Sequence, residues 1–302
     1  MLNGNQNYLV RAAAHGGLVR AFAVNSTAVV SEIQGRHGTE PAVTAALGRL
    51  TTGALLFGAM LKEPGHMVTL RISGDGPAGL LLASANRAGD VRGLVANPRT
   101  DADQVRNGKL NVSGVVGTRG RLTVTRDLGM RSPYVGVVEL VSGEVGEDLA
   151  HYLASSEQTP SAVGIGVFVR ATGDVEAAGG YMIQLMPGVA DAVVAGIEEK
   201  VRSLPHPTTM IREGNAPEDV LSRVFEDGFE LLERTPVRFH CPCSRERVDR
   251  ALLLLGRDEL LEILEQDSAR GLTEVVCEFC GRKYEVPRSD LERLAAEAGA
   301  GA

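Results

Sequence analysis

The sequence predicts an α+β protein with three parts: an N-terminal domain built on a largely antiparallel sheet with packed helices, a helical linker, and a small C-terminal four-cysteine domain. Three observations support this prediction. Strand-like runs follow one another with few helical crossovers, which is typical of antiparallel sheets. From residue 189 the pattern changes to amphipathic helices. All four cysteines lie in the last quarter of the chain.

The strands and helices of the N-terminal domain, residues 1–186, follow from hydrophobic periodicity. Strands are expected at 27–33, 67–72, 80–86, 91–97, 121–127, 134–140, 163–171 and 180–188. Helices are expected at 41–61, where small residues allow close packing, and at 148–158. The Gly-rich stretch 74–79 is predicted to be a turn, because it lacks the GK[ST] ending of a phosphate-binding loop.

The linker, residues 187–234, contains two helical patterns. The first covers 190–204, with an apolar stripe on one face, and ends before Pro205. The second begins near Asn215, which is expected to form a capping box with Glu218.

Gly196 and Gly228 fall inside these two helical patterns, and each lowers helix stability by about 1 kcal/mol relative to Ala. Two interpretations remain open. The pattern alone favours ordinary amphipathic helices packed on the sheet; the alternative is a metastable linker, whose apolar stripes become exposed when docking fails.

The cysteines form two close pairs, Cys241 with Cys243 and Cys277 with Cys280. Residues two apart in an extended segment point the same way, and Pro242 favours that conformation at Cys241. Four thiolates are a common tetrahedral ligand set for structural zinc. We therefore predict a zinc-binding domain at residues 235–288 that holds one Zn2+ per chain in the reduced form through these four cysteines.

The 33 residues between the two pairs hold structure of their own. Helices are expected at 247–256 and 258–267, and a zinc-knuckle hairpin at 273–286. The last residues, 289–302, are predicted to be a tail in which Ser289 and Glu292 form a capping box. His240, beside Cys241, is the alternative ligand.

A closed four-cysteine site has two uses that the spacing leaves open. It is most often a structural support for a binding module. It can also act as a switch, because a disulfide between Cys241 and Cys243 would close a strained, easily reduced ring, and oxidation would remove the metal ligands.

Composition excludes several function classes. The net charge is −7, and residues 235–302 carry 10 Lys and Arg against 13 Asp and Glu, so neither nucleic acid nor membrane is an expected partner. The first ten residues lack the features of a secretory signal, and the longest charge-free apolar stretch, 50–61, is too short for a membrane span of about 20 residues. We expect a cytoplasmic protein. No catalytic motif is present, so we expect no enzyme activity.

The motifs together resemble a known family. RFHCPCSRERVDRALLLLG followed by EVVCEFCGRKYEV closely resembles the redox-regulated bacterial heat-shock chaperones of about thirty-three kilodaltons, a zinc-dependent holdase family. The segments ALGRLTTGALLFGAMLK, RISGDGPAGLL, VRGLVANP, YLASSEQTPSAVGIGV and AAGGYMIQLMPG resemble that family's N-terminal domain in the same order. The resemblance covers residues 8–286.

This resemblance implies a stress-response chaperone that is inactive when reduced and zinc-bound. Under oxidative and heat stress, Cys277 and Cys280 would pair first, Cys241 and Cys243 would follow, zinc would leave and the linker would unfold. The exposed apolar surface would hold unfolded client proteins without ATP and pass them to an ATP-dependent refolding chaperone. The oxidised form would be a homodimer.

The alternative function is a zinc-ribbon adaptor that binds nucleic acid or a partner protein through its folded metal domain. Salt-dependent binding of DNA or RNA by the zinc-loaded form would favour this alternative, although the acidic charge argues against nucleic acid.

Overall fold

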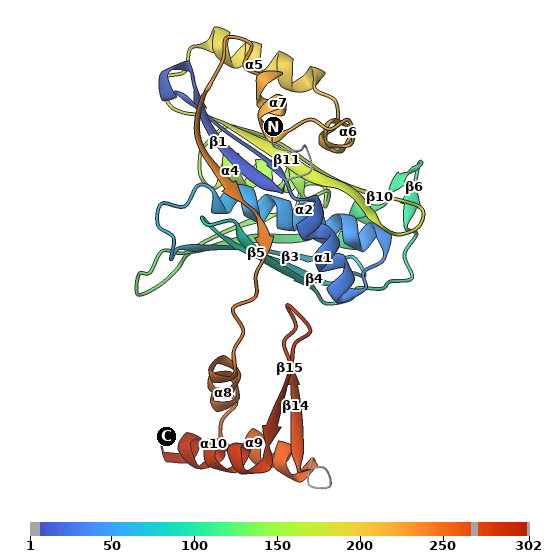
Figure 1. The fold of residues 1–302 in the computed structure, drawn as a ribbon, viewed down its shortest axis with the longest axis vertical. Helices are drawn as coiled ribbons and strands as arrows, with labels where there is room; N and C mark the ends of the chain where they lie inside the picture. The colour runs from blue at the N-terminus through green and yellow to red at the C-terminus, as the bar shows by residue number, and fades with distance from the viewer. Residues whose placement is uncertain (1–6, 267–270, 301–302) are drawn as a thin grey trace. The chain divides into compact units, whose positions relative to one another are not determined.

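The computed structural model describes residues 7–266 and 271–300 and confirms the α+β class with antiparallel sheets (Figure 1). The chain divides into two compact units between His240 and Cys241. Among the described residues, no helix has both the length and the apolar character needed to cross a membrane.

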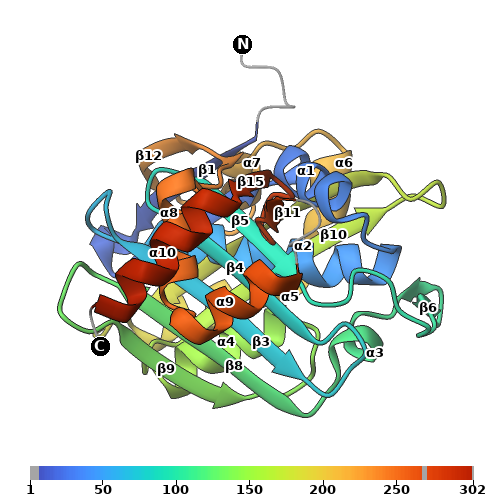
Figure 2. The same ribbon diagram turned by 90° about the horizontal axis from the view of Figure 1, so that it is seen from below.

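The first unit contains two main sheets. The five-stranded sheet consists, in order across it, of β10 (Ser161–Val169), β11 (Val175–Leu185), β2 (Val19–Asn25), β1 (Tyr8–Ala14) and β12 (Glu230–Pro236). The six-stranded sheet consists of β13 (Arg238–Phe239), β5 (Asp90–Val95), β4 (Leu80–Asn86), β3 (Met67–Gly74), β8 (Gly120–Asp127) and β9 (Tyr134–Glu139). Figure 2 shows β5, β4, β3, β8 and β9 side by side. All pairings are antiparallel except that of β13 with β5.

Helix α2 (Pro41–Gly58) lies between the two sheets and is buried along almost its whole length (Figure 1). Its small residues allow this packing: a Cβ atom added at Gly48 would lie 2.6 Å from Val30 Cγ1. The remaining elements around the sheets are α1 (Thr27–His37), β6 (Val105–Arg106), β7 (Lys109–Leu110), α3 (Val112–Val116) and α4 (Gly146–Ser155).

The strand predicted at 27–33 is wrong, because these residues form α1. The Asn25 side chain accepts a hydrogen bond from the Thr27 backbone N–H, and Gly38 closes the helix with a φ of 61°. Val29, Val30 and Ile33 form one buried face. A short run rich in β-branched residues does not distinguish a strand from a buried helix face by periodicity alone.

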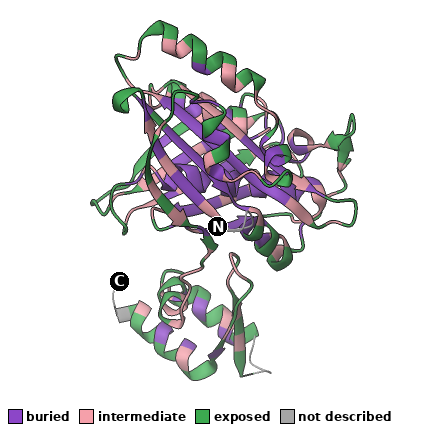
Figure 3. Cartoon of the chain, turned by 45° about the horizontal axis from the view of Figure 1, so that its top comes forward, coloured by how far each residue is buried: buried purple, intermediate pink, exposed green. Residues whose placement is uncertain are grey.

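The segment after β11 packs on the five-stranded sheet through a second, smaller apolar cluster. It contains α5 (Asp191–Ser203), α6 (Pro207–Arg212) and α7 (Pro217–Ser222), followed by β12, a strand that the sequence did not predict. Only Ile197 is buried in α5, which is mostly exposed in Figure 3. The sheet side of this cluster is rich in alanine, at positions 12, 14, 21 and 23. Each of these alanines offers only one methyl group to the helices that cover it.

The capping box predicted for Asn215 and Glu218 is wrong by one residue. Ala216 occupies the cap position of α7, and its N–H donates to Asp219 Oδ2 at 2.7 Å. Asn215 instead donates from Nδ2 to the Met210 carbonyl at 2.8 Å. Pro217 stands at the first helical position, where a missing N–H costs nothing.

Asp148 fixes the loop that leads into α4. Its fully buried carboxylate accepts backbone N–H bonds from Val141, Ser142 and Gly143 through Oδ1 and from Val145 through Oδ2. Val145 has a φ of 70°, which β-branched residues rarely adopt. The hydrogen bonds to one carboxylate hold the backbone in this conformation.

Asp148→Ala is expected to lower the free energy of unfolding of the first unit by about 3 kcal/mol, because it leaves these buried N–H groups without their acceptor. Urea denaturation followed by far-ultraviolet circular dichroism measures the change. The control is Glu147→Ala, an exposed position in the same helical turn. Equal stability of the two variants would show that the carboxylate does not hold the loop.

The second unit contains α8 (Arg245–Leu253), α9 (Arg257–Gln266), the hairpin of β14 (Leu272–Val276) and β15 (Lys283–Pro287), and α10 (Arg288–Ala300). The predicted helices and hairpin are confirmed, except that Asp267 lies outside the described residues. Residues 288–300, predicted mainly as a tail, form α10 and contribute Leu291 and Leu294 to the core of this unit. Helix α10 begins at Arg288, so the predicted cap at Ser289 is wrong.

Candidate metal centre

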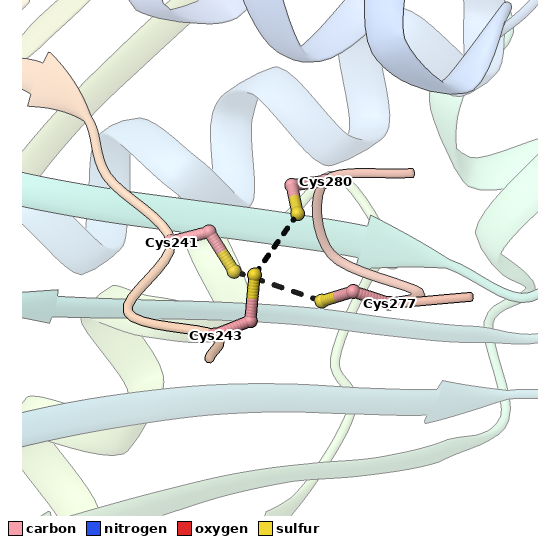
Figure 4. A group of neighbouring side chains, drawn as sticks. All are labelled: Cys241, Cys243, Cys277 and Cys280. Carbon is pink, nitrogen blue, oxygen red and sulfur yellow. Dashed lines mark hydrogen bonds between the residues drawn. The ribbon is translucent and has the colours of Figure 1, made fainter. Parts of the chain in front are cut away.

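The four cysteines reach one point from two segments of the second unit. Cys241 and Cys243 lie in the extended stretch before α8, and Cys277 and Cys280 lie in the turn between β14 and β15. Figure 4 shows the four side chains pointing toward one another. The predicted site residues are therefore brought together, although 33 residues separate the two pairs in sequence.

The spacing of the sulfur atoms fits a tetrahedral metal ion. The Sγ atoms of Cys241 and Cys277 are 3.7 Å apart, and those of Cys243 and Cys280 are 3.4 Å apart. All four sulfurs lie within 4.8 Å of one another. Metal–sulfur bonds of about 2.3 Å in a tetrahedron place the sulfurs about 3.8 Å apart. The cluster can hold one metal ion with only small adjustments.

The backbone of the hairpin turn sets the positions of Cys277 and Cys280. The Cys277 N–H donates to the Arg282 carbonyl at 2.9 Å. The Cys277 carbonyl accepts from the N–H groups of Cys280 at 3.2 Å and Gly281 at 2.8 Å. Gly281 has a φ of 71°, a conformation that favours glycine. The turn thus presents both thiols on the same side.

A small apolar core and one arginine support the cysteine cluster. The core is formed by Leu252, Leu260, Leu264, Val286, Leu291, Leu294 and Ala295. Arg245, two residues after Cys243, bonds to Asp249 at 2.8 Å, to the Glu285 carbonyl at 2.8 Å and to Asp290. Ser244 accepts from the Arg247 N–H at 3.3 Å and caps α8. These contacts link the first cysteine pair to the hairpin and to α10.

The four thiols do not have equal acidities. Burial raises the pKa of Cys243, but the neighbouring Tyr284 hydroxyl and the other thiols outweigh it and lower that pKa to about 7. Burial raises the pKa of Cys277 and raises that of Cys280 to about 12. Because the thiols are so close, the first to ionise is stabilised by its neighbours and disfavours ionisation of the others. A bound cation would favour the thiolate at all four.

Two further residues belong to the site, and the sequence did not single them out. The Tyr284 hydroxyl is buried without a hydrogen-bond partner of standard geometry and lowers the pKa of the neighbouring Cys243, and Arg245 makes the links described above. The only signal for Tyr284 was an aromatic residue just after the second cysteine pair. His240, the alternative ligand, is not in the cluster that the described residues form, and its backbone N–H donates to the Val91 carbonyl at 2.9 Å.

Known proteins match this chain along nearly its whole length. The model of the Hsp33 protein family matches residues 7–287. The chain is 46% identical over 288 residues to the 33 kDa chaperonin of Bacillus subtilis (strain 168), which covers 95% of this chain and 98% of that protein. It is 45% identical over 291 residues to the 33 kDa chaperonin of Desulforamulus reducens, with coverage of 96% and 97%.

A solved structure shares the whole fold. The crystal structure of the 33 kDa chaperonin, a heat shock protein 33 homolog, from Thermotoga maritima superposes with a TM-score of 0.87 at 35% identity. The match covers 98% of this chain and 100% of that one. Sequence and fold agree, and the chain belongs to the Hsp33 family.

Proposed function

We propose that this chain is a redox-regulated, ATP-independent chaperone of the holdase type, kept inactive by one Zn2+ that Cys241, Cys243, Cys277 and Cys280 bind in the reduced form. The observation that carries the proposal is the cluster of four sulfurs within 4.8 Å of one another, in a unit with only a small apolar core. Family membership supports the chaperone activity.

Zinc supplies folding free energy in such a site, on the order of 10 to 16 kcal/mol in small zinc-binding peptides. All four ligand positions are taken by cysteine, which favours a structural role over catalysis. A core of seven buried side chains, counted over residues 241–266 and 271–300, leaves the second unit dependent on this contribution.

Oxidation of the cysteines would remove the ligand set. Each disulfide forms when two thiolates lose two electrons, which a peroxide accepts as it is reduced to water. In the order that the family resemblance implies, Cys277 pairs with Cys280, and Cys241 then pairs with Cys243. Neither disulfide retains a thiolate to bind the metal, so zinc is released and the second unit loses its main source of stability.

The apolar surface for clients would come from the segment that contains α5, α6 and α7. Ile197 is the only buried residue of α5, and alanines form much of the sheet surface beneath these helices. Strands β12 and β13 connect α7 to Cys241. We infer that unfolding of the second unit undocks the helices and exposes the apolar cluster. In the cytoplasm, an ATP-dependent chaperone would then refold the clients, and the oxidised form would be a homodimer.

Light scattering of a thermally unfolding client enzyme tests the proposed function. The reduced, zinc-loaded protein is expected to leave aggregation nearly unchanged. After peroxide treatment at raised temperature, the same protein is expected to suppress it at about one chain per client. Equal suppression by the two forms would remove the redox switch.

A further inference from the structure

Strand β9, at the edge of the six-stranded sheet, carries an exposed apolar strip. Its only neighbour in the sheet that the described residues form is β8 (Figure 2). Val135 and Val137 of β9 are 52% and 50% exposed, and Met130, Tyr134 and Val141 nearby are exposed as well. Five of the fourteen large apolar side chains that are exposed in the described part of the chain therefore lie within twelve residues.

The backbone of β9 has free hydrogen-bonding groups along its outer edge. The Leu140 N–H donates to the Gly120 carbonyl at 2.9 Å, and hydrogen-bonded pairs alternate along an antiparallel ladder. Every second residue of β9 therefore bonds to β8, and the residues between them face outward. The N–H and C=O groups of Val135, Val137 and Glu139 point away from the sheet, where no strand of the described chain pairs with them.

This edge is weakly protected against pairing with another strand. Edge strands are usually protected by charged side chains, prolines or bulges. In β9 the one charged residue, Glu139, is already paired with Arg121 of β8 at 2.9 Å. Val135 and Val137 belong neither to the buried core nor to the segment that contains α5, α6 and α7. The edge is open while the four cysteines are reduced, and undocking of that segment does not alter it.

A second copy of the chain fits this edge. Two β9 strands can pair antiparallel about a two-fold axis that passes through Val137. Val137 then lies opposite the same residue of the second copy, and Val135 lies opposite Glu139. The outward groups of these residues meet as hydrogen-bonded pairs, so that each pair exchanges two backbone hydrogen bonds.

The neighbouring two-fold registers that pair the outward groups are less favourable. An axis at Val135 would place Pro133, which has no N–H, opposite Val137. An axis at Glu139 would place two carboxylates directly opposite each other. An axis at Val137 leaves each Glu139 beside its own Arg121, so two chains of net charge −7 meet where the charges are neutralised.

We propose that two copies of this chain associate through β9 about an axis at Val137, so that their six-stranded sheets form one continuous sheet. An unfolded client could also pair with an open edge, but a reduced form that bound clients there would not be inactive. The choice of a second copy thus rests on the proposed function. Because the edge is open before and after oxidation, the homodimer forms in the reduced protein too, through the same contact.

Sedimentation velocity of the reduced, zinc-loaded, full-length protein tests the association. The unaltered chain is expected to shift from monomer to dimer as its concentration rises. Val137→Lys is expected to weaken this association at least about tenfold, because it places two ammonium groups opposite each other on the axis. The matched control is Val105→Lys on β6, where an equally exposed valine lies outside the contact. An unaltered chain that stays monomeric, or equal association of the two variants, would overturn the proposal.

A mixture of charge variants tests the position of the axis. Val137→Lys and Val137→Glu are each expected to associate poorly alone, and to form a mixed dimer at least about tenfold more tightly, because opposite charges then meet across the axis. Circular dichroism and zinc content verify that each variant is folded. In the unaltered chain, hydrogen exchange of the Val135, Val137 and Glu139 amides is expected to slow as concentration rises. No gain on mixing would exclude this axis.

Client aggregation measured on the same samples separates this inference from the proposed function. Suppression that appears only after oxidation, in a protein whose association Val137→Lys does not change, supports the holdase function and refutes the β9 contact. Concentration-dependent association that Val137→Lys abolishes, in a protein that never suppresses aggregation, supports the contact and refutes the holdase function.

Discussion

Cys277→Ser is expected to reduce the zinc content of the reduced protein from one per chain to nearly none and to unfold the second unit. A serine hydroxyl is a poor zinc ligand, and the described residues of this unit form a core of only seven buried side chains. Loss of a metal worth on the order of 10 kcal/mol exceeds what such a core can replace. A colorimetric zinc assay and hydrogen exchange of the β14–β15 amides measure the two effects.

Ser244→Ala is the control for this variant, because it lies beside the first cysteine pair without being a ligand. It removes the cap of α8, where the Ser244 hydroxyl accepts from the Arg247 N–H, and is expected to cost about 1 kcal/mol with full zinc content. A Cys277→Ser protein that keeps one zinc and a protected hairpin would show that the metal does not hold this unit together.

Leu221→Ala is expected to make the reduced, zinc-loaded protein suppress client aggregation without peroxide. Leu221 is fully buried in the cluster that docks α5, α6 and α7 on the five-stranded sheet. Truncation of a buried leucine costs about 2 to 5 kcal/mol, and this loss is expected to weaken the docking of these helices. Hydrogen exchange of the α5–α7 amides is expected to rise together with the suppression measured by light scattering.

The matched control for docking is Leu232→Ala on β12, where the leucine is 51% exposed. Its expected effect on stability is within about 0.5 kcal/mol, with no suppression in the reduced state. If Leu221→Ala speeds exchange in the helices and yet leaves aggregation unchanged, their apolar cluster is not the surface that holds clients.

The sequence predicted those helices and strands whose own residues show a clear hydrophobic pattern. The long apolar run with small residues became α2, and the alternating runs became β3, β4, β8 and β9. Strands β1 and β2 were missed, because their alanines carry little strand propensity. Pairing with strands that are distant in sequence stabilises them: β12 pairs with β1, and β11 pairs with β2.

The cysteine cluster was predictable for a chemical reason. Metal ligation needs particular side chains at particular spacings, and the two pairs meet that need regardless of the 33 residues between them. Arg245 carries no such signal, because only the folded unit brings its side chain to the Glu285 carbonyl and to Asp290.

The most direct test of the redox account follows zinc, thiols and activity in the same samples of the unaltered chain during a peroxide titration at raised temperature. A zinc-sensitive dye, thiol alkylation with mass spectrometry, and light scattering give the three quantities. The account predicts one zinc and four protected thiols at the start, and loss of both in step with the gain of aggregation suppression. Full suppression by chains that still hold zinc and four reduced cysteines would contradict it.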